Sequence, residues 1–167
     1  MVLSSTINEN EEIKMEIQLG DLDSSAVKSL LQQHHSDMLN HSPTESVHAL
    51  DLSSLKADDV TFWTIWDGQS LAGCGALKKL NDNHAEIKSM RTSAKHLRQG
   101  VAAKLLAHIL TVAQQQSYKK VSLETGTADA FIPAQKLYQK FGFIPCKPFA
   151  HYTLDPYSMF FTKHLKI

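Results

Sequence analysis

A single glycine stands at the front of an apolar helical run over residues 96–110, HLRQGVAAKLLAHIL. The first turn of a helix presents about four backbone N–H groups without intrahelical partners, and the helix dipole adds partial positive charge there. Small residues such as Gly100, Ala102 and Ala103 would let a phosphate or pyrophosphate approach these groups. Arg98 could add a charged hydrogen bond. The residues alone fit an ordinary helix start equally well, because one glycine is a weak motif.

The same stretch lacks the motifs of the common nucleotide-binding loops. No Gly-Lys-Ser/Thr follows the glycine and Gly-x-Gly-x-x-Gly is absent, so neither ATP nor NAD is expected. Cys74 and Cys146 are too few for a disulfide scaffold and have no metal-ligand spacing, so no metal site is expected. Cys146 lies beside prolines without an evident base, which favours a buried thiol over an acyl-cysteine.

Composition limits the kind of partner. The chain has 167 residues, and its 17 Lys and Arg balance its 17 Asp and Glu, so no basic field favours nucleic acid or an anionic membrane. No apolar run approaches the roughly 20 residues of a membrane span. The N-terminal segment lacks the basic and apolar regions of a signal peptide. We therefore expect a cytoplasmic protein that binds neither nucleic acid nor membrane.

The elements that would position these residues follow from apolar periodicity. Residues 1–12 are polar and aperiodic and predict a loose tail, followed by a single domain over 13–167. Asp67-Gly68 between two strand-like runs predicts a hairpin, and residues 84–92 predict a third strand of the same meander. Other strands are expected over 13–19, 119–125, 142–149 and 157–165, and helices over 23–39, 101–115 and 133–141. This order predicts a mixed α/β fold with an antiparallel N-terminal meander.

Three segments in fixed order resemble the GNAT superfamily of acyl-CoA-dependent N-acetyltransferases. They are EIKSMRT, HLRQGVAAKLL and LETGTADAFIPAQKLYQKFGF. The last contains the family pattern Ala-x-x-Leu-Tyr-x-x-x-Gly-Phe at every position, over 134–143. The resemblance covers residues 60–145, and the segment from Gly142 onward is similar to a branch of small bacterial GNAT proteins. It implies a GNAT-like fold with a mixed central sheet of about six to seven strands and flanking helices.

The resemblance implies acetyl-CoA as co-substrate. In the family, the main chain at Met90 and Thr92 contacts the pantetheine arm at a splayed strand edge, where a backbone N–H polarises the thioester carbonyl. The family's pyrophosphate loop usually begins with Arg or Gln, whereas this chain has Leu97, so the backbone amides and Arg98 are expected to hold the anion. The residues implied to contact acetyl-CoA are Met90, Thr92, Leu97, Arg98, Gln99, Gly100, Val101, Ala102, Thr125, Ala134 and Tyr138.

Acetylation of an amine needs one proton removed from the amine and one delivered to the leaving CoA thiolate. The resemblance implies Tyr138 as the acid and Glu86 as the base. The alternatives are a core tyrosine and a solvated strand glutamate. Glu124, or a relay through water, is another candidate for the base.

The expected reaction is transfer of an acetyl group from acetyl-CoA to a primary amine by direct attack in a ternary complex. A small-molecule amine is the favoured acceptor, and a protein lysine or N-terminus stays open. The alternatives to an enzyme are a non-catalytic acyl-CoA-binding or sensing protein and an unrelated α/β interaction domain. His34, His35 and His41 lie on the helix and exit that usually wall the family's acceptor pocket. A homodimer is common in the family and is possible here.

Overall fold

A computed structural model describes residues 15–47 and 51–166. The predicted tail over 1–12 and the first residues of the predicted strand over 13–19 lie outside the described residues. The strands are β1 (Met15–Leu19), β2 (Val60–Asp67), β3 (Ser70–Asn81), β4 (His84–Thr92), β5 (Lys120–Gly126), β6 (Ile144–Pro145) and β7 (Ser158–His164). The α-helices are α1 (Ser25–His41), α2 (Leu52–Leu55), α3 (Val101–Gln115) and α4 (Ile132–Lys140), and short 3-10 turns are η1 (Thr44–Ser46), η2 (Ala94–His96) and η3 (Asp129–Phe131).

The strands form one mixed sheet in the order β1-β2-β3-β4-β5-β7-β6, which confirms the predicted fold class. β1 to β4 are antiparallel neighbours, β4 and β5 are parallel, and β7 lies antiparallel between β5 and β6. The predicted hairpin is present, because β2 ends at Asp67, β3 begins at Ser70, and Gly68 takes a φ of 58°. The strand predicted over 142–149 is only Ile144–Pro145, since Pro145 and Pro148 cannot donate to a ladder.

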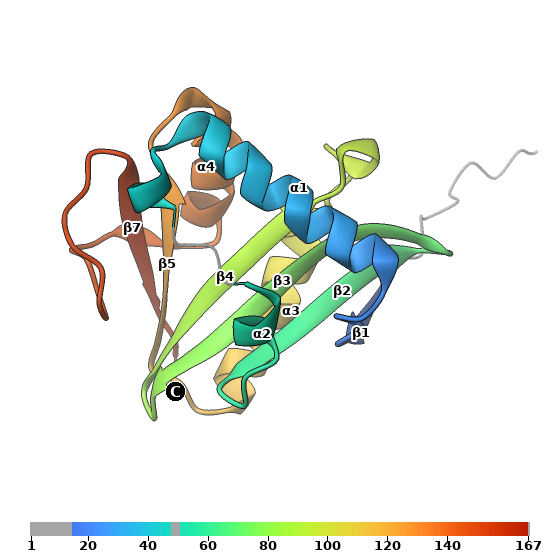
Figure 1. The fold of residues 1–167 in the computed structure, drawn as a ribbon. Helices are drawn as coiled ribbons and strands as arrows, with labels where there is room; N and C mark the ends of the chain where they lie inside the picture. The colour runs from blue at the N-terminus through green and yellow to red at the C-terminus, as the bar shows by residue number, and fades with distance from the viewer. Residues whose placement is uncertain (1–14, 48–50, 167) are drawn as a thin grey trace, which may run out of the picture.

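Helices cover both faces of the sheet (Figure 1). α1 crosses one face, where Val27 and Leu30 pack with Cys74 and Ala76 in the smaller core. α3 lies on the opposite face, and its apolar stripe packs in the larger core with residues of α4. Alternation along β4 puts Ala85 and Ile87 in that larger core. Glu86 and Lys88, which alternate with them before the bulge, therefore point toward the α1 face.

A bulge interrupts β4 in its second half. The register of β3 against β4 shifts between Cys74 and Ala76, so that Ser89 and Met90 together lie opposite Gly75. Ser89 has a φ of 56°, an uncommon conformation for a residue with a side chain. A bulge bends the strand that carries it and is frequent beside active sites. The bulge therefore turns the end of β4 away from its parallel neighbour.

The parallel pairing of β4 with β5 stops at this bulge. The last aligned pair is Ile87 with Leu123, although both strands continue, β4 to Thr92 and β5 to Gly126. A gap between adjacent strands thus opens in the middle of the sheet. It corresponds to the splay that the resemblance implies.

Candidate active site

A cavity of about 120 Å³ lies where β4 and β5 separate. Its walls come from both faces of the sheet, with α1 on one side and α4 on the other. The predicted acetyl-CoA and catalytic residues that line it are Glu86, Met90, Thr125, Ala134 and Tyr138, and the alternative base Glu124 and the α1 residue His34 line it as well. The fold thus brings together predicted residues that are up to 104 positions apart in the chain, from His34 to Tyr138, around one cavity.

The other predicted cofactor residues lie outside this cavity. Thr92 ends β4, and residues 97–100 form an exposed turn that leads into α3. Arg98 and Gly100 in this turn both take positive φ, 63° and 78°. Val101 is only 2% exposed and its side chain belongs to the core, so its main chain is the part that can face a ligand. The turn and the first residues of α3, including half-buried Ala102, present backbone amides at the head of the helix.

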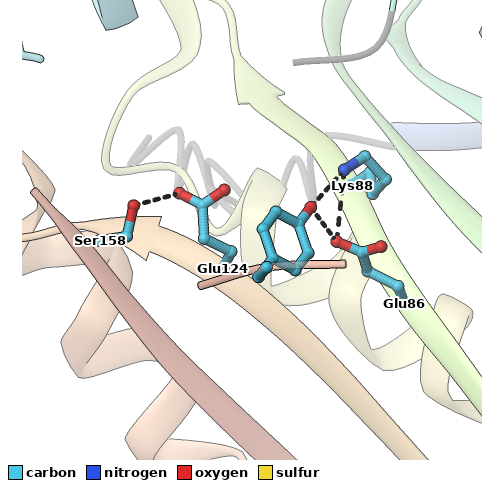
Figure 2. A network of polar contacts seen from close by, with 5 residues as sticks. Glu86, Lys88, Glu124 and Ser158 are labelled. Atoms are coloured by element: carbon cyan, nitrogen blue, oxygen red, sulfur yellow. Dashed lines mark hydrogen bonds and ion pairs between the residues drawn. The ribbon is translucent and has the colours of Figure 1, made fainter. Parts of the chain in front are cut away.

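Glu86 is buried within the sheet at 3% exposure, so a solvated glutamate is not what the structure shows. Its Oε2 atom accepts a hydrogen bond of 2.5 Å from the Tyr152 hydroxyl and an ion pair of 3.3 Å from Lys88 Nζ. Lys88 Nζ also donates to the Tyr152 oxygen at 2.6 Å. Figure 2 shows the Glu86 and Lys88 side chains pointing toward one another from the same strand. A buried carboxylate is thus held by a closed set of charge-assisted hydrogen bonds.

Tyr152 was not predicted from the sequence. It lies in the segment between β6 and β7, where its ring packs against Phe149 and Phe160 at centroid distances of 5.1 and 5.5 Å. Burial, the nearby Glu86 charge and the hydrogen bond to Glu86 together raise the pKa of Tyr152 well above its ordinary value. The hydroxyl therefore keeps its proton and acts as a donor to Glu86.

Glu124 lines the same cavity from β5 and accepts a 3.3 Å hydrogen bond from Ser158 Oγ (Figure 2). Glu86, Lys88 and Glu124 place two carboxylates and one ammonium on the cavity wall. The formal charges of these three side chains sum to minus one, which favours a cationic ligand such as an alkylammonium.

Tyr138 lies on α4 at 7% exposure and lines the cavity opposite the α1 face. Its ring packs edge-on against Phe143, with centroids 5.8 Å apart. Burial raises the pKa of Tyr138 to about 12, so the hydroxyl stays protonated at neutral pH. Tyr138 is both a core residue and a possible proton donor to a group in the cavity.

His34 extends from α1 into the cavity wall, whereas its neighbour His35 is exposed. Burial, and then the positive charge of Arg91, lower the pKa of His34 to about 4. Arg91 is held close by an ion pair with Asp37 of α1. His34 is therefore neutral at neutral pH and leaves the negative charge of the wall unchanged.

The depressed pKa of His34 predicts a loss of stability in mild acid. The unfolded chain binds a proton at His34 near pH 6.5 and the folded chain only near pH 4, so stability falls as the pH drops between these values. We expect His34→Gln to remove about 2 kcal/mol of this loss, as measured by urea unfolding at pH 7, 5.5 and 4.5. His164→Gln, at an exposed histidine away from His34, is the matched control and should keep the wild-type pH dependence. Identical pH dependence in wild type and His34→Gln would contradict the assignment.

Neither cysteine lines the cavity. Cys74 is buried, donates a weak hydrogen bond of 3.3 Å to the Ser89 carbonyl, and has its pKa raised to about 12 by burial. Cys146 is half-buried rather than buried, and desolvation raises its pKa as well. Both thiols are poor nucleophiles in these surroundings.

Two further features concern the part of the chain that the structure describes. Over residues 15–47 and 51–166, no group of three or more His, Cys, Asp or Glu side chains is arranged to hold a metal ion. Within the same residues, no helix combines the length and the apolar character that a membrane crossing requires.

Lys88 and Tyr152 were not predicted as site residues, and of the two only Lys88 could have been found from the sequence pattern. Lys88 lies two positions after Glu86 on the same strand, so strand alternation alone puts the two side chains on one face. Tyr152 is 66 positions from Glu86 in a segment without regular structure. Only the tertiary fold brings its hydroxyl to the carboxylate.

Comparison with known proteins shows which family this chain resembles. Residues 26–143 match the family model of the Acetyltransferase (GNAT) family. The chain is 52% identical over 151 residues to the uncharacterized N-acetyltransferase YsnE of Bacillus subtilis (strain 168), covering 90% of this chain and 100% of that protein. It is also 52% identical over 144 residues to the uncharacterized N-acetyltransferase YedL of Escherichia coli (strain K12), covering 86% and 91%.

Solved structures share the fold at lower sequence identity. An acetyltransferase of Bacillus subtilis in complex with CoA superposes with a TM-score of 0.68 at 20% identity, covering 92% of this chain and 100% of that one. A GNAT family acetyltransferase of Elizabethkingia anophelis with acetyl-CoA bound gives a TM-score of 0.65 at 20% identity, covering 90% and 98%.

Proposed function

This chain belongs to the GNAT family and is an N-acetyltransferase, and from that premise we propose that it transfers an acetyl group from acetyl-CoA to the primary amine of a small molecule. The observation that carries the proposal is the cavity between β4 and β5, which gathers buried Glu86 and protonated Tyr138. Structures with the same fold contain acetyl-CoA or CoA, which supports acetyl-CoA as the donor.

In the proposed reaction the amine attacks the thioester directly within a ternary complex. Glu86 takes a proton from the ammonium, and the nitrogen forms a bond to the acetyl carbon. A backbone N–H at Met90 or Thr92 stabilises the carbonyl oxygen as negative charge develops on it. The carbon–sulfur bond breaks, and Tyr138 gives its proton to the leaving thiolate. The second proton that the nitrogen loses as the amide forms restores the Tyr138 hydroxyl. The inert surroundings of both cysteines support direct attack over an acyl-cysteine intermediate.

The cavity also favours a compact cationic acceptor. Its volume of about 120 Å³ accommodates an acetyl group and an amine head. The net negative wall attracts the ammonium form in which a primary amine exists at neutral pH. A protein lysine presents the same head group on a flexible stem, so peptides belong among the acceptors tested.

A panel of amines tests this function. Release of CoA thiol is followed with alkylamines, aromatic amines, amino acids, polyamines and lysine peptides, and the acetylated product is identified by mass. We expect turnover of a small amine and stabilisation of the protein by acetyl-CoA, about 2.7 kcal/mol at 100 times its Kd. Stabilisation without any acetylated product would favour a non-catalytic acyl-CoA-binding protein. No stabilisation at saturating acetyl-CoA would contradict the proposal.

A carboxylate at the head of α3 should weaken acetyl-CoA binding. Ala102 lies in the first turn, where we propose that backbone amides hold the pyrophosphate. Ala102→Glu should raise the KM for acetyl-CoA by about tenfold or more through charge repulsion, while the acidic side chain suits a helix N-terminus and leaves the fold intact. Thr111→Glu, exposed farther along the same helix, is the matched control. An unchanged KM in Ala102→Glu would place the pyrophosphate elsewhere.

A further inference from the structure

We propose that Tyr152 is a positioning residue, which fixes one oxygen of the Glu86 carboxylate so that the other oxygen can take the proton of the acceptor amine. The inference rests on the proposed role of Glu86 as the base. It adds a residue from the β6–β7 segment to a site otherwise built from β4, β5, η3, α1 and α4.

The hydrogen bonds to Glu86 fall on a single oxygen. Tyr152 donates to Oε2 at 2.5 Å, and Lys88 Nζ lies 3.3 Å from the same atom. Within the described part of the chain, no hydrogen bond to Oε1 is found. Oε2 is therefore the anchored oxygen, and Oε1 is the oxygen that stays available to a bound amine.

The Tyr152 side chain is held in place through both its ring and its hydroxyl. Phe149 and Phe160 pack against its ring, and Lys88 Nζ lies 5.4 Å from the ring centroid while donating to the hydroxyl oxygen. The hydroxyl oxygen accepts from Lys88, so its single proton points to Glu86. The same segment is tied to η1 by a 2.6 Å hydrogen bond from Ser46 Oγ to Asp155 Oδ2. The donor is thus fixed before any ligand enters.

This anchoring bears on catalysis because the terminal torsion of a glutamate has a broad energy profile. Without Tyr152, only Lys88 would orient Glu86, and the carboxylate could turn both oxygens toward the ammonium. Charge-assisted hydrogen bonds of this kind contribute enough to change a rate by about tenfold. In the proposed site, acetyl-CoA contacts residues other than Tyr152, so its binding should not depend on Tyr152.

A double-mutant cycle separates positioning from simple packing. Tyr152→Phe keeps the ring contacts and should lower kcat about tenfold, with the KM for acetyl-CoA unchanged. In a Glu86→Gln background, the same substitution should cost less than about twofold, because the base through which Tyr152 acts is gone. Tyr157→Phe, in the same segment and 45% exposed, is the matched control and should leave kcat unchanged.

Equal losses in both backgrounds, or no loss in the wild-type background, would overturn the inference. If Glu86→Gln is too slow to measure, Glu86→Asp provides the second background, since the shorter carboxylate no longer meets the Tyr152 hydroxyl. If Tyr152→Phe unfolds, Lys88→Met repeats the cycle at the other donor to Oε2, and the absence of coupling there is equally decisive. A wild-type rate that Glu86→Gln does not change refutes the base assignment itself, and a wild type without activity refutes the proposed function.

Discussion

Glu86→Gln is expected to lower kcat about 100-fold or more while changing the KM for acetyl-CoA by less than about twofold. The amide has the size of the carboxylate and can still accept the Tyr152 hydrogen bond, but it cannot accept a proton from an ammonium. Steady-state kinetics with the most active amine of the panel measure both constants. A loss confined to kcat is the signature of a proton transfer within the ternary complex.

Two controls accompany this variant. The substitution removes the counter-charge of buried Lys88, so we expect a stability loss of about 1–3 kcal/mol, and melting curves must show that the enzyme is folded at the assay temperature. Glu124→Gln changes the other carboxylate of the same cavity and should reduce kcat by less than about tenfold. A large loss in Glu124→Gln together with an active Glu86→Gln would transfer the base role to Glu124.

Tyr138→Phe is expected to lower kcat about 100-fold with acetyl-CoA affinity intact. The phenol is the protonated group that we propose delivers a proton to the departing sulfur, and phenylalanine preserves its packing against Phe143. Isothermal titration with acetyl-CoA and steady-state kinetics separate affinity from turnover. The loss should shrink with an acetyl thioester whose thiol has a lower pKa, because a better leaving group needs less help from an acid.

Tyr118 provides the matched control for this prediction. It is a buried tyrosine at 8% exposure, its pKa is also raised by burial, and it does not line the cavity. Tyr118→Phe should leave kcat within about twofold of wild type. A Tyr138→Phe enzyme with unchanged kcat, or a loss that is the same for every leaving group, would show that Tyr138 is only a core residue.

Local sequence patterns were sufficient to predict most of the helices and strands of the fold. The Asp67-Gly68 turn and alternating apolar residues predicted the meander, and the aliphatic run after Gly100 predicted α3, because each depends on neighbours close in the chain. The strand over 142–149 was predicted too long because apolar content outweighed the two prolines that interrupt it. The bulge at Ser89 was not predicted, since no glycine marks its positive φ.

The site could be predicted only where it is built from nearby residues or from a family pattern. Glu86 and Tyr138 came from such patterns, and the structure places both on one cavity. Lys88 followed from the strand period but was not singled out. Tyr152 could not be found, because its place beside Glu86 depends on how β7 is inserted beside β5 and on the aromatic contacts of the intervening segment. Long-range contacts of this kind leave no periodic trace in one sequence.

The structure also shows the backbone conformation and the exposure of the turn at residues 97–100. Arg98 and Gly100 adopt left-handed conformations, and nothing lies within 4 Å of a Cβ added at Gly100. The turn is therefore open to solvent at the head of α3. Leu97, where the family usually has Arg or Gln, is 58% exposed and contributes no charge. This leaves backbone amides and Arg98 as the proposed anion-binding groups.

A crystal structure of the wild-type protein with acetyl-CoA tests the account most directly. We predict the pyrophosphate against the backbone amides of residues 100–102, and the thioester in the gap between β4 and β5 with its carbonyl oxygen near the main chain of Met90 or Thr92. The acetyl group should then lie between Glu86 and Tyr138. Acetyl-CoA bound elsewhere, or with its thioester outside the cavity, would contradict the proposed site and mechanism.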